Sequence, residues 1–119
     1  MAAQTNKITM INLETDATAS GFYEKYPYFS KLSVPAGTYK GIDTDIPSFQ
    51  DSALWVANKD VPDDVVYQML SVIFTEDGFA HMAGQKKTFK DMSIKTGLNG
   101  IVTPIHPGAV KFWKEKGLL

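Results

Sequence analysis

Val34-Pro35-Ala36-Gly37-Thr38-Tyr39-Lys40-Gly41-Ile42-Asp43-Thr44-Asp45-Ile46-Pro47-Ser48-Phe49 has the densest turn chemistry in the chain. Pro35 fixes its own φ and pushes the residue before it towards extended geometry. Gly37 and Gly41 accept positive φ at little steric cost, so a sharp reversal fits there. Pro47 cannot donate a ladder hydrogen bond, so a strand entered here begins at an edge or after this residue. The stretch is therefore predicted to be an ordered loop between strands.

Apolar periodicity on either side of this loop predicts the remaining elements. Those before and just after it are a strand over 7–13, a small polar link over 14–20, a short helix over 21–26, a strand over 28–34 and a central strand over 52–57, buried on both faces. The later elements are a helix over 61–75, one or two helical turns over 79–85, a solvated lysine-rich stretch over 86–95 and a last helix that starts at Pro107 and stops at Gly117.

This order of elements predicts an α/β or α+β fold, with a small mixed sheet flanked by helices. The chain has 119 residues, which the usual size relation treats as a single domain over 1–119. No internal repeat and no low-complexity linker divides it.

Composition narrows the classes of function. The net charge of −1 gives no general attraction to nucleic acid or anionic membrane. The chain has no cysteine, so disulfides and thiolate chemistry are excluded. It has no arginine either, so the bidentate fork that usually clamps a carboxylate is missing. No segment resembles a signal peptide or a membrane span.

Several uncommon strings occur in order and carry a resemblance to a known family. They are Pro35-Ala36-Gly37-Thr38-Tyr39 with Gly41, Asp45-Ile46-Pro47, Asp60-Val61-Pro62-Asp63-Asp64-Val65-Val66-Tyr67, Thr103-Pro104-Ile105-His106-Pro107-Gly108-Ala109-Val110 and Lys114-Glu115-Lys116-Gly117. Upstream, Ile11-Asn12-Leu13 and Lys25-Tyr26-Pro27-Tyr28-Phe29 fit the same pattern. From about residue 8 to its end, the chain resembles the C-terminal portion of the TAXI-family solute receptors of TRAP transporters.

The resemblance implies part of a type II periplasmic binding protein, in which two α/β lobes close over a small anionic or zwitterionic solute such as a glutamate-like amino acid. The implied partners are that solute and the TRAP membrane subunits, without nucleic acid or cofactor. The implied compartment is the periplasm; without a signal peptide, a complete chain would be cytoplasmic. Because the N-terminal lobe is missing from the pattern, we expect the chain alone to bind solute weakly or not at all.

Five residues are the candidates for ligand binding: Gly37, Thr38, Tyr39, Ser48 and His106. Thr38, Tyr39 and Ser48 offer hydroxyl groups, and the glycine offers a backbone N–H to an anion. The alternative for the loop is that its prolines and glycines only set the path of the chain. His106 stands near a helix N-terminus, where anions are favoured. Its alternative, and the favoured one, is a cap whose ring hydrogen-bonds to backbone.

Other chemistry is not indicated. His81 stands alone, without a second histidine at metal spacing, and the aspartates of residues 43–64 suit turns and caps better than a calcium loop. No nucleophile motif occurs, so an enzyme is not expected. Trp55 and Trp113 are expected in the core. In a whole receptor, the missing part would cover apolar surface of this chain. Exposure of that surface favours a homodimer, so the alternative function is that of a free-standing, dimeric interaction module.

Overall fold

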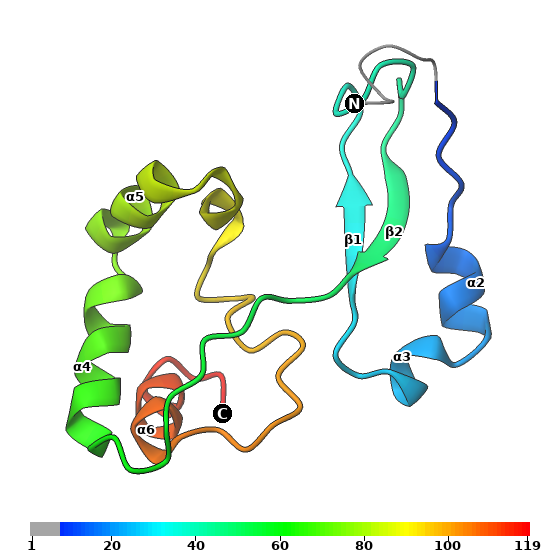
Figure 1. Cartoon of the computed structure of the whole chain (residues 1–119). Helices are drawn as coiled ribbons and strands as arrows, with labels where there is room; N and C mark the ends of the chain where they lie inside the picture. Colours follow the sequence, from blue (N-terminus) through cyan, green and yellow to red (C-terminus); the bar gives the residue numbers. More distant parts are fainter. Residues whose placement is uncertain (1–7) are drawn as a thin grey trace. The chain divides into compact units, whose positions relative to one another are not determined.

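The computed structural model describes residues 8–119, which form two compact units, up to Ala53 and from Leu54 onward. The first unit contains α2 (Glu14–Ala19), α3 (Phe22–Lys25), β1 (Ser30–Val34) and β2 (Ile46–Gln50). The second contains α4 (Asp63–Ile73), α5 (Glu76–Gln85), the 3-10 helix η1 (Lys87–Asp91) and α6 (Pro107–Glu115). The predicted combination of helices with a small sheet is confirmed, and the sheet is a two-stranded antiparallel one (Figure 1).

The first unit is a β-hairpin with helices along one face. β1 and β2 pair from Ser30 opposite Gln50 to Val34 opposite Ile46. Phe49 faces the helices, where its ring lies 4.8 Å from that of Phe22, between centroids. Because side chains alternate across a strand, the neighbouring Ser48 belongs to the other face of the hairpin.

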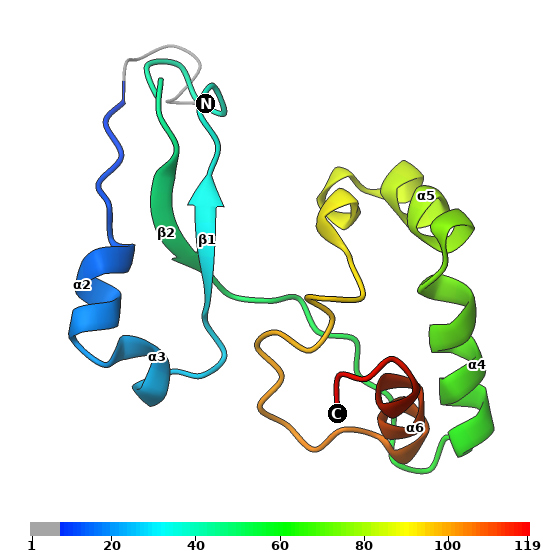
Figure 2. The same cartoon turned by 180° about the vertical axis from the view of Figure 1, so that it is seen from behind.

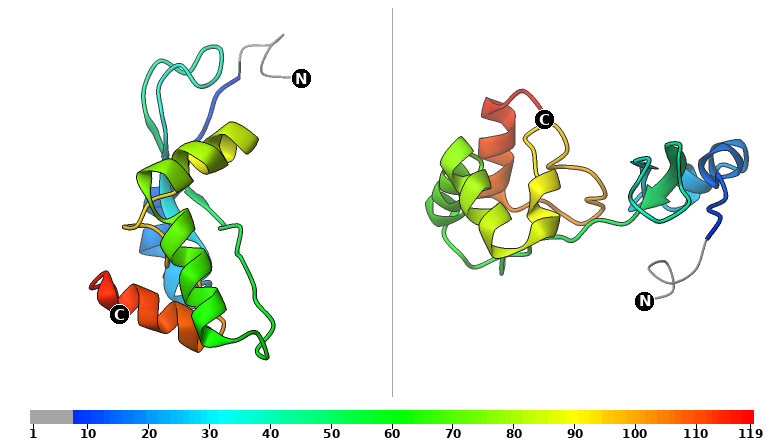
Figure 3. Two further views of the ribbon diagram at one scale, coloured as in Figure 1. Left: turned by 90° about the vertical axis from the view of Figure 1, so that its left-hand side faces the viewer. Right: turned by 90° about the horizontal axis from the view of Figure 1, so that it is seen from above.

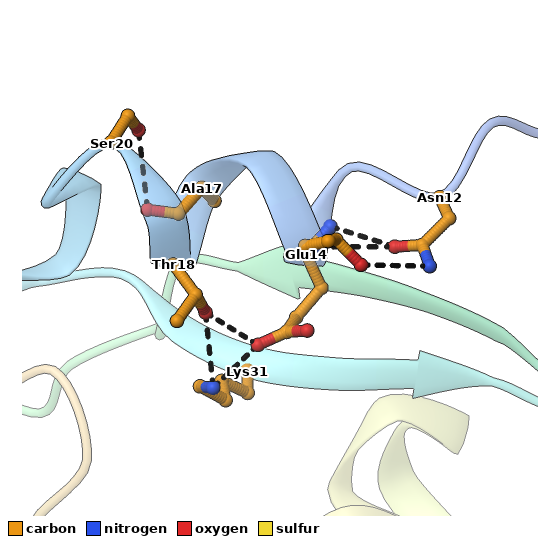
Figure 4. Close-up of polar contacts among 7 residues, drawn as sticks. Asn12, Glu14, Ala17, Thr18, Ser20 and Lys31 are labelled. Atoms are coloured by element: carbon orange, nitrogen blue, oxygen red, sulfur yellow. Dashed lines mark hydrogen bonds and ion pairs between the residues drawn. The ribbon is translucent and has the colours of Figure 1, made fainter.

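A polar cluster fastens α2 to β1 (Figure 4). The Lys31 ammonium lies 2.5 Å from the Glu14 carboxylate and 3.1 Å from the Thr18 hydroxyl, which itself donates to Glu14 at 2.7 Å. The hydrogen bond from Lys31 holds the pKa of the Glu14 carboxyl below its usual range. All three side chains are near solvent, so this cluster orients the helix more than it stabilises the unit.

The core of the second unit lies between α4 and α6, which pack side by side (Figures 2 and 3). Val66 of α4 and both Phe112 and Trp113 of α6 are buried. The Phe74 ring, at the end of α4, contacts the Trp113 ring edge to face at 4.9 Å. The predicted helices over 61–75 and from Pro107 are confirmed, and Trp113 lies in the core as predicted.

Four predictions about residues 7–57 are wrong. Residues 8–13 have no regular structure, and Lys7 lies outside the described residues. The Asn12 side chain accepts from the Glu14 and Thr15 N–H groups, so the expected polar link begins as the helix α2. The end of the predicted loop is β2, an edge strand of the two-stranded sheet, where a proline is tolerated.

The fourth wrong prediction concerns the central strand over 52–57. This segment has no regular structure, and Trp55 and Val56 are 51% and 86% exposed. Its sequence has the composition of a buried strand, but no described strand lies beside it to complete a ladder. Trp55 is therefore not a core residue in this structure.

Candidate functional site

The loop between β1 and β2 is held by its own backbone and one carboxylate. The Gly37 N–H donates to the Ile42 carbonyl at 2.7 Å, and the Ala36 N–H donates to the Asp45 carboxylate at 2.8 Å. Gly37 and Gly41 have φ angles of 79° and 89°, in the left-handed region that side chains rarely adopt. The Ile42 side chain, which belongs to the same loop, is buried. The predicted turn chemistry is confirmed. The hydrogen bond from the Ala36 N–H to Asp45 also stabilises the loop, and residue types alone did not single out this carboxylate.

Four of the five candidate ligand residues lie in the first unit. Thr38 and Tyr39 are exposed at the loop, and Ser48 is half-buried on β2, opposite Leu32. The Gly37 N–H is engaged by the Ile42 carbonyl, so in this conformation it is not offered to an anion. Among these four candidates, the hydroxyl groups of Thr38, Tyr39 and Ser48 are the polar groups that remain for a ligand, and their role in binding stays a prediction.

His106 belongs to the second unit, where it caps α6. Its Nδ1 accepts from the Gly108 N–H at 3.2 Å, and its Nε2 lies 3.0 Å from the Val61 carbonyl. A carbonyl only accepts, so Nε2 is the donor in its contact with Val61. The side chain is only 9% exposed. Both ring nitrogens are satisfied, so the capping alternative is confirmed and neither nitrogen is available to a ligand in this conformation.

Gly108 explains why the ring of His106 reaches the start of α4. A Cβ placed on Gly108 would lie 2.1 Å from the carbonyl oxygen of Asp63, which no side chain tolerates. The missing side chain lets the first turns of α4 and α6 meet. The string Pro104-Ile105-His106-Pro107-Gly108 is thus a corner that joins two helix N-termini, with Pro107 at the first helical position.

A second polar link joins the same helices near the end of α6. The Tyr67 hydroxyl donates to the Glu115 carboxylate at 2.7 Å, and the Lys111 ammonium lies 4.5 Å from the centre of the Tyr67 ring. The hydrogen bond to Glu115 raises the pKa of the Tyr67 phenol. Sequence reasoning missed this link because 48 residues separate its partners.

Two open hollows lie on the second unit, neither of them lined by a candidate ligand residue. One, of about 510 Å³, runs along the junction of α4 and α5 and is lined in part by Thr75, Asp77 and His81. The other, of about 360 Å³, follows Val65, Met69 and Val72 on α4 and is mostly apolar. The Thr75 hydroxyl already donates to the Val72 carbonyl and accepts from the Gly78 N–H, so its only proton is engaged within the protein.

Two negative findings hold for residues 8–119. No group of three or more His, Asp or Glu side chains within this part of the chain is placed to hold a metal ion. None of the helices in the same range is long and apolar enough to cross a membrane.

Comparison with known protein families identifies the family of this chain. The sequence model of the NMT1-like family matches residues 1–117. The chain therefore belongs to the NMT1-like family, which is a family of the periplasmic-binding-protein type. The general function that corresponds to this type is solute binding.

Proposed function

We propose that this chain is the solute receptor of a TRAP-type transport system of the TAXI kind, or a portion of such a receptor. Its solute is a small anion or zwitterion of the glutamate type. Membership of the NMT1-like family over residues 1–117 is the observation that carries the proposal. The ordered strings from Pro35 to Gly41 and from Thr103 to Val110 support the narrower TAXI assignment. The same proposal gives the chain a binding role and no catalytic one.

The proposed contacts use hydroxyl groups. Thr38, Tyr39 and Ser48 would donate to the carboxylate oxygens of the solute, and the Gly37 N–H would join them only after releasing the Ile42 carbonyl. The chain has no arginine to form two parallel bonds with a carboxylate. We therefore expect weak binding, with a dissociation constant of about 1 mM or more, equivalent to roughly −4 kcal/mol.

An NMR titration tests this site. We expect L-glutamate to shift the amide signals of Gly37, Thr38 and Ser48 progressively, and Thr38→Val to weaken the response. Thr44→Val, in the same loop and also exposed, is the matched control and should leave the response unchanged. Absence of shifts in this loop would remove these residues from the site, and micromolar affinity by calorimetry would contradict the expected weakness.

The proposed partners are the TRAP membrane subunits, and the proposed workplace is the periplasm. We expect the chain to co-purify with these subunits from membranes more strongly when solute is present, since closure over solute is what a receptor presents to its transporter. Equal recovery with and without solute would contradict a receptor role.

A homodimeric interaction module is the second candidate function. It is favoured by apolar side chains left exposed on the second unit, among them Val72 of α4 at 69% and Val56 at 86%. Exposed apolar surface of this kind favours association. Sedimentation velocity over a concentration series should show a reversible dimer, and a clean monomer at high micromolar concentration would exclude this candidate.

A further inference from the structure

The segment 51–59, Asp-Ser-Ala-Leu-Trp-Val-Ala-Asn-Lys, has the composition of a strand but none of a strand's contacts. It is irregular up to the turn at Lys59. Within residues 8–119, no backbone–backbone hydrogen bond is made by residues 52–57. Leu54, Trp55 and Val56 are all exposed, although neighbouring side chains of a strand point to opposite faces. Free backbone groups with apolar side chains are what a strand presents to another strand.

The sequence of this segment is nearly symmetric about Trp55. Two copies placed antiparallel, with Trp55 opposite Trp55, produce the pairs Leu54–Val56, Ala53–Ala57, Ser52–Asn58 and Asp51–Lys59. Aliphatic residues oppose aliphatic ones, small polar residues oppose polar ones, and opposite charges meet at both ends. Directly opposed charges of opposite sign stabilise a pair of strands, and like charges destabilise it.

The charges also favour this register over its neighbours. Sliding one copy so that Trp55 faces Leu54 would place Asp51 opposite Asn58 and Lys59 opposite Gln50, which loses both ion pairs. Sliding one copy by a single residue, so that Trp55 faces Val56, would place Asp51 opposite Asp60 at both ends of the pairing. In the symmetric register each end instead joins Asp51 to Lys59, an ammonium that is exposed and now contacts only the neighbouring Asp60 among the described carboxylates.

We propose that residues 51–59 are the contact between two copies of this chain, paired as antiparallel strands across a two-fold axis at Trp55. A two-fold axis requires one surface to complement itself, and the symmetry of the segment meets that requirement. The inference rests on the proposed homodimer and identifies its interface. Because two short strands are only marginally stable together, we expect a weak, reversible dimer.

Charge reversal tests the register by analytical ultracentrifugation. Asp51→Lys and Lys59→Asp each place like charges at both ends of the pairing, so each should weaken dimerisation about tenfold or more. The double variant Asp51→Lys/Lys59→Asp restores opposite charges and should recover the affinity of the natural chain. Asp43→Lys makes the same change of charge at another exposed loop position and should have no effect.

Cross-linking tests the same register independently, since the chain has no cysteine of its own. Ser52→Cys/Asn58→Cys should yield a covalent dimer on mild oxidation, whereas the offset pair Ser52→Cys/Lys59→Cys should do so much more slowly. Recovery in the charge-swapped double variant together with selective cross-linking supports the proposal. A monomer at high micromolar concentration overturns the homodimer and its interface together. A dimer that neither the charge variants nor the cysteine pairs affect overturns the interface alone.

Discussion

At the scale of single residues, two positions explain the string Pro-x-His-Pro-Gly without a ligand. His106 spends one ring nitrogen on its own helix and the other on the Val61 carbonyl, 45 residues earlier. Gly108 provides the space in which the two helix starts meet. This string therefore holds a corner of the fold.

Replacing His106 by alanine should lower the free energy of unfolding by about 1–3 kcal/mol, because it removes a cap and leaves the Val61 carbonyl without its donor. His106→Asn retains an acceptor for the Gly108 N–H, so its free energy of unfolding should lie between those of the natural chain and the alanine variant. Denaturant unfolding followed by the fluorescence of the buried Trp113 measures the effect. An alanine variant as stable as the natural chain would show that the ring is not structural and would return it to the ligand candidates.

Gly108→Ala should lower stability by about 1–3 kcal/mol or prevent α6 from docking, since the added methyl group meets the Asp63 backbone. Gly84 of α5 is the matched control, because a Cβ there meets nothing within 4 Å. Gly84→Ala should raise stability by about 0.4–1 kcal/mol through helix propensity and a less flexible unfolded chain. Equal stability changes at both positions would contradict the close approach of α4 and α6.

At the scale of elements, α4 is apolar on two sides. Its inner side, with Val66, packs on α6, while Val65, Met69 and Val72 are exposed. A helix that is apolar nearly all round is usually buried on every side.

The polar link from Tyr67 to Glu115 fixes how α4 and α6 lie against each other, which apolar packing alone specifies less sharply.

The link between Tyr67 and Glu115 can be followed by pH titration. Because the pKa of Tyr67 is raised in the folded chain, its stabilising effect is present below about pH 10, the ordinary tyrosine value, and is lost as the pH rises through the folded value. Glu115→Ala should return the ionisation of the Tyr67 phenol, measured by ultraviolet absorbance, to a lower pH. Glu76→Ala removes a carboxylate from α5 and should leave the Tyr67 ionisation at its original pH. If Glu76→Ala lowers that pH as much as Glu115→Ala does, the hydrogen bond to Glu115 is not the cause of the raised pKa.

At the scale of the whole molecule, length predicts a single domain over 1–119, while the contacts divide the chain into two compact units that meet in sequence between Ala53 and Leu54. Each unit has its own apolar cluster, around Phe49 in one and around Phe112 and Trp113 in the other. The boundary falls inside the segment 51–59, so the proposed dimer contact lies where the units join in sequence.

Hydrogen exchange tests the two units separately. We expect amides of β1 and β2 to open with a different free energy from those of α4 and α6, and to respond differently to low concentrations of denaturant. Mass spectrometry of peptic peptides resolves both sets in one experiment. Identical opening free energies and denaturant slopes would show one cooperative unit, as the length predicts.

The sequence by itself determined the features that depend on neighbours within about four residues: the turn at Gly37 and Gly41, the start of α6 at Pro107 and the stop at Gly117, whose φ is 72°. Only the tertiary structure decided which strand-like segments pair. β2 found a partner in β1, and the more apolar segment 52–57 found none among the described strands. It also decided that His106 bridges two helices. A strand requires a second strand to pair with, and the His106 ring requires the Val61 carbonyl, 45 residues away in the sequence. The spacing of residues within one segment encodes neither of these contacts.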